Sequence, residues 1–272
     1  MTKAGGLISS AARLLFPPKC AVCGIPVRPD GPPLCGACLE KWEREREEFA
    51  KEPPPAPPEG IKRAYHLAFY TPSRRVGGTA ADNPAADIPA ADILAYSMKQ
   101  GKNGDVYPFI ARQLCERLYL GAVDGRRAPD EAGLKRLSGC FGLVSYLPRS
   151  AKNAAKYGVD QSRSMAKEIS RLSGIRFAPL YVNSSKKTQH ELSAGERLAN
   201  MSGLKLKDGA GKLLQETKLI IVDDIVTTGA SVSAAAELAL EAGAKEVTLL
   251  APFRTKSNQG DQKHENRYPD RA

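Results

Sequence analysis

The fold of this 272-residue chain is decided by the stretch Leu219-Ile220-Ile221-Val222-Asp223-Asp224-Ile225-Val226-Thr227-Thr228-Gly229-Ala230-Ser231. Four apolar residues come first, as in a strand that is buried on both faces of a parallel sheet. Two adjacent carboxylates follow, and a short loop then leads into the helix-like stretch 232–242. The free N–H groups and the dipole at the start of such a helix favour a phosphate. The stretch therefore predicts a strand, an acidic pair, a phosphate loop and a helix.

The side chains of the loop favour a sugar phosphate as its ligand. Thr227, Thr228 and Ser231 offer hydroxyl donors, and Gly229 lets the backbone approach closely. The loop contains no lysine, which excludes a nucleotide-triphosphate loop of the Walker type. The acidic pair is placed to accept hydrogen bonds from sugar hydroxyls or to face a magnesium shell, as in a ribose 5-phosphate site. The alternative is a buried strand with an acidic turn before an ordinary helix.

Outside this stretch, strand-like and helical patterns alternate along the chain. Strands are expected at 65–70, 141–146, 177–182, 218–222 and 246–250, and helices at 39–51, 93–99, 106–120, 162–172 and 189–200. Such alternation predicts an α/β fold, a parallel sheet with helices on both faces. Ligands bind beyond the carboxyl ends of the strands in such sheets, where Asp223 and Asp224 are expected.

Four cysteines near the N-terminus form a candidate metal site with the spacing C-x2-C-x11-C-x2-C: Cys20, Cys23, Cys35 and Cys38. Each pair can hold two thiolates on one turn, and the four sulfurs complete a tetrahedral zinc site. Four thiolates leave no position for water, so the zinc is expected to be structural and to supply the folding energy of this segment. Disulfides and free thiols are the alternatives, and disulfides need an oxidising compartment.

Composition divides the chain into four parts. Residues 1–52 are expected to form the zinc-binding four-cysteine module, and the proline-rich stretch 53–60 is a stiff linker. Residues 61–253 are expected to form the main α/β domain, and the polar stretch 254–272 a disordered basic tail. The linker predicts a metal-bound head that is separate from the main domain.

Charge and hydropathy limit the class of protein. A hydrophobic content of 42% is ordinary for a globular core. No apolar run approaches the roughly 20 residues that span a bilayer, and the N-terminus lacks a signal peptide pattern, so we expect a cytoplasmic protein without a membrane span. The net charge of +10 suits polyanions such as nucleic acid and phosphorylated metabolites, and serves solubility equally well.

The stretch 219–231 resembles the phosphoribosyl-pyrophosphate (PRPP) binding motif of type I phosphoribosyltransferases. The resemblance implies that Asp223 and Asp224 accept the 2- and 3-hydroxyls of the ribose and help to orient magnesium. It assigns the 5-phosphate to residues Thr227, Thr228, Gly229, Ala230 and Ser231. Arg149, with Lys152, is expected to neutralise the pyrophosphate group together with magnesium.

The arrangement of head, linker and C-terminal domain resembles the ComF family, which includes competence-associated proteins of DNA uptake and GntX-like proteins. Three segments carry the resemblance. Leu192–Asn200 is similar to the family's Leu-Ser-x-x-Glu-Arg-x-x-Asn signature, and Tyr157–Gln161 to its Gly-Phe-Asn-Gln segment, with Val159-Asp160 in place of Phe-Asn. Lys99–Lys102 is similar to its Lys-Tyr-x-Gly segment. The family implies a parallel-sheet, type I phosphoribosyltransferase-like fold with a small N-terminal zinc module.

Several function classes remain open at this stage. The first is a transferase, specifically a glycosyltransferase, that moves phosphoribosyl from PRPP to an acceptor. The second is a non-catalytic PRPP- or nucleotide-sensing protein of DNA uptake, whose zinc head docks single-stranded DNA or a DNA-processing protein. The third is a nucleobase-salvage enzyme, which does not need a zinc head.

The sequence leaves catalysis undecided. Ser145-Tyr146-Leu147-Pro148 stands where the family commonly has Val-Pro-Val-Pro, the pyrophosphate loop. No residue stands out as a general base. His190 is a candidate, with a solvated helix histidine as the alternative. Lys186 and Lys187 either close over the ligand or form a solvated basic turn. The acceptor and the oligomeric state are not predicted.

Overall fold

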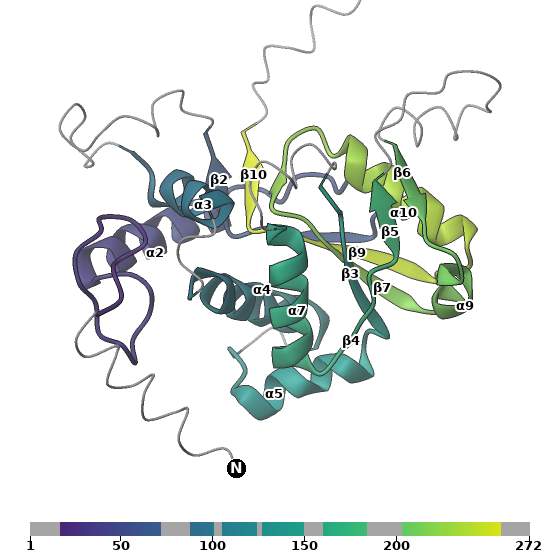
Figure 1. Cartoon of the computed structure of the whole chain (residues 1–272), viewed down its shortest axis with the longest axis horizontal. Coiled ribbons are helices and arrows are strands. Elements are labelled where there is room, and N and C mark those ends of the chain that lie inside the picture. The colour runs from purple at the N-terminus through teal and green to yellow at the C-terminus, as the bar shows by residue number, and fades with distance from the viewer. Residues whose placement is uncertain are drawn as a thin grey trace, which may run out of the picture.

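The computed structural model describes residues 17–71, 88–100, 105–123, 127–149, 160–183 and 203–256. Within these ranges a five-stranded sheet forms the centre, with strand order β1-β9-β7-β3-β4 and every pair parallel (Figure 1). Its strands are β1 (Arg63–Tyr65), β3 (Leu143–Tyr146), β4 (Arg176–Phe177), β7 (Lys218–Val222) and β9 (Glu246–Leu250). The predicted parallel α/β fold is confirmed.

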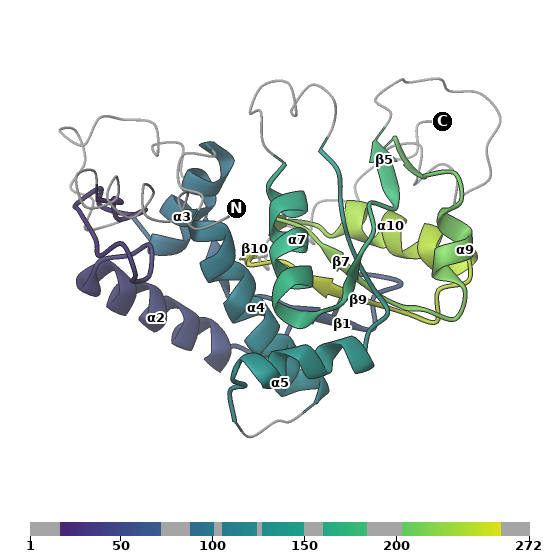
Figure 2. The ribbon, with the colours of Figure 1, turned by 60° about the horizontal axis from the view of Figure 1, so that its bottom comes forward.

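The central strand β7 is buried on both faces, as its apolar run predicts. Ile220 and Val222 join a core formed with α4 (Val106–Ala122) and α7 (Gln161–Ser173). Leu219 and Ile221 face the opposite way, because side chains alternate along a strand. They join a second core with two other helices, α9 (Ala210–Leu214) and α10 (Ala230–Glu241). Figure 2 shows these helices on the two sides of the sheet.

Beyond the carboxyl edge of this sheet, three of its strands continue into a smaller parallel sheet. Its order is β2-β10-β8, which repeats the order β1-β9-β7 of the main sheet. The continuing strands are β2 (Ala68–Tyr70), β10 (Phe253–Thr255) and β8 (Ile225–Val226). Two residues separate each continuing strand from its parent: His66-Leu67, Ala251-Pro252 and Asp223-Asp224. The acidic pair therefore lies in a strand break between two sheets.

These breaks differ from the sequence expectations. The alternating stretch 65–70 was expected as one strand, but it forms the end of β1 and all of β2. The stretch after Val222 was expected to leave the sheet, whereas Ile225 and Val226 pair with β10. The predicted end of the main domain at residue 253 falls inside β10. Only pairing with distant strands fixes such breaks, so the local alternation does not reveal them.

A further break occurs at 178–180. The expected strand 177–182 is divided between β4 and β5 (Tyr181–Asn183), which pairs with β6 (Leu204–Leu206) in an antiparallel ribbon. The stretch 123–137 is polar and basic, which favours a loop or a partly helical insertion; it contains α5 (Glu131–Lys135) and the start of a 3-10 turn, Arg136–Gly139. The predicted helix 162–172 is α7, which Asp160 caps by accepting from the backbone N–H of Arg163.

The cysteine head packs against the rest of the protein through α2 (Gly36–Lys51), at the left of Figure 1. Trp42 on α2 is fully buried. Its indole N–H donates to Oε1 of Gln113 at 3.0 Å, and its ring meets Phe253 edge-on at 6.2 Å. Cys20 and Leu34 belong to the same hydrophobic core as α4 and β10. The head and the main sheet therefore share one core, although the linker predicted a separate head.

A second contact joins α2 to α3 (Ala90–Gln100). Both carboxylate oxygens of Glu45 accept backbone N–H groups at the start of α3, from Ala90 at 2.7 Å and from Ala91 at 2.9 Å. The first N–H groups of a helix have no partner within it, so Glu45 supplies the cap from another helix. Lys41 donates to the carbonyl of Ile88 at 2.6 Å. The head thus fixes the start of α3.

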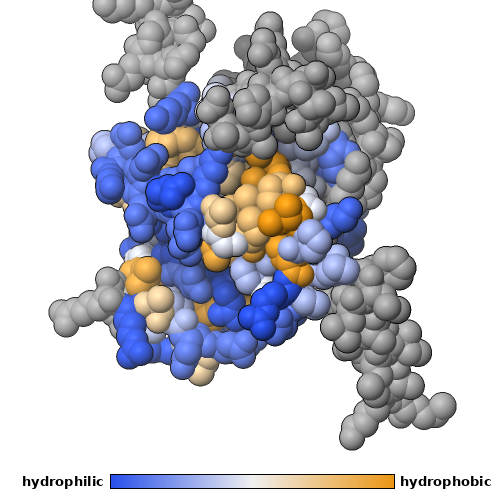
Figure 3. Space-filling view, turned by 90° about the vertical axis from the view of Figure 1, so that its left-hand side faces the viewer, coloured by the Kyte–Doolittle hydropathy of each residue, from blue (hydrophilic) through white to orange (hydrophobic). Residues whose placement is uncertain are grey.

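Among the described residues, no helix has both the length and the apolar character that crossing a membrane requires. Figure 3 shows the face that lies at the left of Figure 1, where an apolar patch lies next to hydrophilic residues. The head contributes exposed apolar surface, since Ile25 is 51% exposed.

Candidate functional site

Asp223 and Asp224 are held in the strand break by bonds of the main chain. The N–H of Asp223 donates to the carbonyl of Leu250 at 3.1 Å, as if β7 continued. The N–H of Asp224 donates to Oδ1 of Asp223, and the N–H of Ile225 to Oδ1 of Asp224, each at 2.9 Å. Each carboxylate is thus tied to the next backbone N–H, which leaves its second oxygen for other partners.

The two carboxylates repel each other in a partly buried position. Burial raises the pKa of Asp223 to about 8, and the charge of Asp224 adds to the increase. Two hydrogen bonds to Asp223 lower its pKa: one from the backbone N–H of Asp224, and one from the hydroxyl of Ser162, which donates to Oδ1 at 3.3 Å. An adjacent acid pair of this kind favours a cation or hydroxyl donors as its ligand.

Arg149 lies beside this pair, just beyond the end of β3. Its Nη2 donates to Oδ2 of Asp224 at 3.2 Å, with side chains that are 13% and 22% exposed, respectively. The backbone N–H of Arg149 donates to Oδ2 of Asp160 at 3.4 Å. The structure therefore brings the predicted pyrophosphate residue into contact with one of the predicted ribose residues.

The loop 227–231, predicted to hold the phosphate, follows β8 directly. Gly229 caps α10 with a φ of +82°, a conformation that side chains rarely adopt. A Cβ there would also lie 2.9 Å from Cγ of Pro58, so the linker rests against the loop. Thr227, Thr228, Ala230 and Ser231 are exposed. The loop thus presents hydroxyls and the first N–H groups of α10, as the sequence predicted, but Gly229 is required by the turn and by Pro58.

The remaining candidates are not placed. Lys152, Lys186, Lys187 and His190 lie outside the described residues, as do most of the ComF-like segments. What the structure brings together is therefore an acid pair, an arginine and a helix N-terminus at the carboxyl edge of one sheet. A ligand that carries a diol and phosphate groups matches this set chemically.

The four cysteines of the head form a cluster. All four Sγ atoms lie within 4.8 Å of one another, and those of Cys23 and Cys35 are 3.6 Å apart. A tetrahedral zinc ion with bonds of about 2.3 Å requires sulfurs about 3.8 Å apart. No pair is joined as a disulfide. Cys20 and Cys23 flank a knuckle closed by Gly24 at φ +77°, and Cys35 and Cys38 begin α2.

The sulfur environment fits a metal ion. Burial raises the pKa of Cys20, but backbone N–H groups of Cys23, Cys35 and Val22 donate to its sulfur and bring the pKa to about 7. Burial raises the pKa of Cys38 strongly, and its sulfur neighbours add to the rise. Four thiolates this close repel one another, and a divalent cation between them removes that cost. The donor set and spacing are those of a structural zinc site.

Comparison with known proteins agrees with this arrangement. The family model described as "Phosphoribosyl transferase domain" matches residues 158–271, which include the acid pair and the phosphate loop. The chain is 25% identical over 242 residues to the DNA utilization protein YhgH of Salmonella typhimurium, covering 87% of this chain and 84% of that protein. The DNA utilization protein YhgH of Escherichia coli K12 is 26% identical over 242 residues, which again cover 87% of this chain and 84% of that protein.

The C-terminal part of the chain therefore matches the phosphoribosyl transferase domain, and most of its length is similar to DNA utilization proteins. Solved structures were also matched. The chain is 16% identical to the glutamine PRPP amidotransferase of B. subtilis, with a TM-score of 0.37 over 58% of this chain and 30% of that one. It is 16% identical to a hypoxanthine phosphoribosyltransferase of Staphylococcus aureus, with a TM-score of 0.29 over 54% of this chain and 64% of that one.

Three residues to which the sequence analysis gives no role in the site lie beside the predicted site residues. Asp160 joins Arg149 to the start of α7, and Ser162 contacts Asp223. Burial raises the pKa of Tyr107 on α4 to about 12. The charges of Arg149 and Asp224 also contribute to this pKa, so Tyr107 lies near both residues. Asp160 carries a sequence signal, since an aspartate before a helical pattern predicts an N-cap. The other two carry none.

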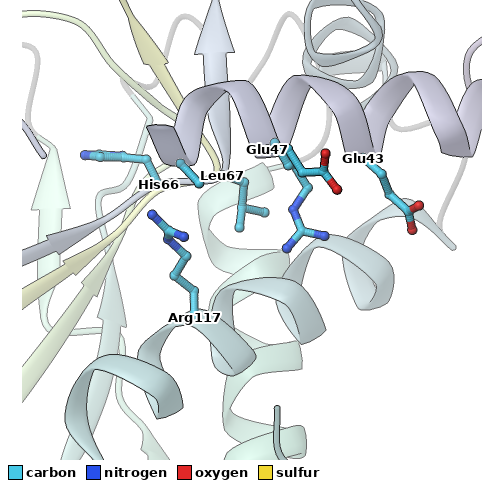
Figure 4. A pocket seen from close by; sticks show the side chains of 7 residues that line it. Glu43, Glu47, His66, Leu67 and Arg117 are labelled. Carbon is cyan, nitrogen blue, oxygen red and sulfur yellow. The ribbon is translucent and has the colours of Figure 1, made fainter. Parts of the chain in front are cut away.

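The three described cavities are lined by other residues. One, of about 290 Å³, lies between α2 and α4 and includes Glu43, His66 and Arg117 in its lining (Figure 4). His66 is 3% exposed and donates from Nδ1 to the carbonyl of Ala251 at 3.0 Å. Burial lowers its pKa to about 4, so it is neutral at pH 7. This histidine ties together two of the three strand breaks and is structural.

Proposed function

We propose that this protein is a member of the ComF family, binds PRPP with magnesium at the strand break and acts in DNA uptake or utilisation. One observation carries the proposal: the acid pair, Arg149 and the N-terminus of α10 meet at one edge of the sheet. PRPP presents a diol, a 5-phosphate and a pyrophosphate, which are the three groups that such a set recognises.

Each part of PRPP has a partner in this arrangement. Asp223 and Asp224 would accept the ribose hydroxyls and share magnesium. The loop 227–231 would hold the 5-phosphate with its hydroxyls and with the first N–H groups of α10. Arg149 and magnesium would neutralise the pyrophosphate. The raised pKa of Asp223 supports the assignment, because a cation or a pair of hydroxyl donors relieves the repulsion between the two acids.

Calorimetric titration of the full chain tests the proposal. PRPP is expected to bind in the presence of magnesium, and EDTA is expected to abolish binding. Ribose 5-phosphate is expected to bind more weakly because it lacks the pyrophosphate. Absence of heat with magnesium and PRPP at millimolar concentration would exclude the proposed ligand.

Arg149→Gln is expected to have opposite effects on two ligands. Arg149 forms an ion pair with Asp224 in the free protein. Its removal leaves the carboxylate of Asp224 open to a cation, so magnesium alone should bind more tightly. The same change removes a positive charge from the pyrophosphate, so magnesium-PRPP should bind about tenfold or more weakly. Titration calorimetry with each ligand measures both effects.

The matched control is Arg171→Gln, which breaks an exposed ion pair with Glu168 near the far end of α7. Both affinities should stay unchanged in that variant. If Arg149→Gln weakened magnesium and magnesium-PRPP alike, the arginine would not exchange partners on binding.

Catalysis is a second candidate within the same proposal. In a transfer, the C1–oxygen bond of PRPP breaks and pyrophosphate leaves with the electron pair. A lone pair of the acceptor forms the new bond to C1, and the acceptor releases its proton. Positioning and charge stabilisation would carry most of the rate. A pyrophosphate-release screen across nucleobases and other nitrogen acceptors separates an enzyme from a PRPP-sensing protein and from a salvage enzyme.

The role in DNA use rests on the relatives, which are described as DNA utilization proteins. The partner proposed for the cysteine head is single-stranded DNA or a DNA-processing protein, and the apolar patch of Figure 3 lies on the face that carries the head. A cytoplasmic location is part of the proposal, because zinc needs four thiols that stay reduced. Cell fractionation tests the location.

A further inference from the structure

We propose that Gln161 and Ser162, the first two residues of α7, are positioning residues of the ribose-phosphate site. This inference rests on the proposed function, since it assigns them to the orientation of Asp223. Gln161 anchors the start of α7 to the neighbouring helices, and Ser162 then fixes the carboxylate of Asp223.

The first step of the argument is the contact between Ser162 and Asp223. Ser162 is 2% exposed, and its hydroxyl donates to Oδ1 of Asp223 at 3.3 Å. The same oxygen accepts the backbone N–H of Asp224 at 2.9 Å. Two donors on Oδ1 fix the plane of the carboxylate and turn its second oxygen away from α7. Ser162 is the side-chain donor of the two, and so it sets the rotamer.

The second step is the anchor of α7. Gln161 has no exposed surface, and its Nε2 donates to the carbonyl of Met98 at 3.2 Å. The hydroxyl of Tyr107 on α4 donates to the same carbonyl at 2.7 Å. Met98 lies in the last turn of α3, where helical carbonyls have no partner within the helix. One carbonyl thus ties together the end of α3, the start of α4 and the start of α7.

The third step links this anchor to the acid pair. A hydroxyl at the second position of a helix follows any movement of the helix start, and α7 begins at Gln161. Displacement by a fraction of an ångström weakens a hydrogen bond that is already 3.3 Å long. Asp223 then loses the orientation that a ribose hydroxyl requires, although neither Gln161 nor Ser162 touches the ligand.

The test uses the full chain and titration with magnesium-PRPP. Ser162→Ala is expected to weaken binding about tenfold, since it removes the side-chain donor that orients Asp223. Ser162→Thr keeps the hydroxyl and is expected to restore the affinity to within about threefold of the wild type. The matched control is Ser170→Ala, which removes a 2.6 Å bond to the carbonyl of Ile175 near the other end of the same helix. Its affinity should not change, although its melting temperature falls.

A second pair of variants tests the anchor. Gln161→Met keeps the length of the side chain and removes the donor to Met98, and it should weaken binding as Ser162→Ala does. Gln113→Met is the control, because it loses a different buried bond, the one from the indole of Trp42, in which α7 takes no part. Its affinity should stay that of the wild type.

The outcomes separate this inference from the proposed function. If the wild type does not bind magnesium-PRPP, the proposed function fails. If the wild type binds and Ser162→Ala stays within twofold of it, or if threonine does not restore the loss, the positioning role fails while the proposed function stands. Equal losses in Gln161→Met and Gln113→Met would show a general effect of stability, and would also overturn the role of Gln161.

Discussion

Asp223→Asn is expected to make the free protein more stable at neutral pH while it removes the binding of magnesium-PRPP. Burial and the charge of Asp224 raise the pKa of Asp223 from its usual value of 3.8 to about 8. In the unfolded chain this carboxyl ionises near 3.8. Between these two values the folded state holds a proton that the unfolded state has lost, so stability falls as the pH rises. Asparagine carries no ionisable group, so the free-energy cost of ionising a buried carboxyl is absent. Its side-chain oxygen still accepts from the N–H of Asp224 and the hydroxyl of Ser162.

The expected size of the effect follows from the pH window. Below pH 4 the variant and the wild type should differ little, because Asp223 is protonated in both states. Towards pH 8 the melting temperature of the variant should exceed that of the wild type by at least about 3 °C, since each kcal/mol corresponds to about 2–4 °C in a protein of this size. The affinity for magnesium-PRPP should fall about 100-fold, because a hydrogen bond to a charged group is worth about 1.5–3 kcal/mol.

The control is Asp208→Asn, a substitution at an exposed aspartate before α9, which should alter neither quantity. The two readouts together are more informative than either alone. If Asp223 had only a structural role, its replacement would lower the melting temperature. The affinity for PRPP would then fall only as far as the loss of stability explains. A rise in stability with a loss of binding is expected only where the fold tolerates a strained acid for the sake of a ligand. A lower melting temperature at pH 8 would contradict the electrostatic account.

The part of the site that could be predicted is the part that is local in sequence. The run from Leu219 to Ser231 contains a strand, an acid pair and a helix start in order, and each follows from neighbouring residues. The structure places them at the carboxyl edge of a parallel sheet, as expected. The cluster of four sulfurs was predictable for the same reason, since two turns supply two ligands each.

The part that could not be predicted depends on pairing between distant segments. Whether Ile225 and Val226 leave the sheet or continue it is decided by β10, which alone provides their partner. Ser162 reaches Asp223 only because α7 and β7 are neighbours in space. A serine in a helical pattern reads as an ordinary polar residue, and neither its burial nor its target has a local signal.

The linker illustrates a different limit. A proline-rich stretch predicts extended backbone correctly, but it does not tell whether the segments on either side pack together. Trp42 and Phe253, which lie near opposite ends of the chain, share one core. Pro58 rests against the phosphate loop. The linker and the cysteine head therefore both pack against the main domain, in addition to any role of the head in docking.

Cys35→Ser is expected to release zinc and to destabilise the whole protein. Structural zinc sites supply much of the folding free energy of their segment, about 10–16 kcal/mol in isolated zinc-finger peptides. Cys35 also precedes α2, which carries Trp42 into the shared core. Loss of a buried tryptophan contact costs about 3–5 kcal/mol, which corresponds to a fall of roughly 10 °C in melting temperature. Zinc content and thermal unfolding measure the two effects.

The single tryptophan of the chain makes this prediction specific, because fluorescence reports only on Trp42. Removal of zinc should shift its emission to longer wavelength as water reaches the indole, and affinity for magnesium-PRPP should fall with it. Cys140→Ser is the matched control, since Cys140 is half-buried and lies outside the sulfur cluster. If zinc were lost while the emission and the affinity stayed native, the head would be an independent unit. The shared core would then contribute nothing to the site, and the separation that the linker predicted would hold.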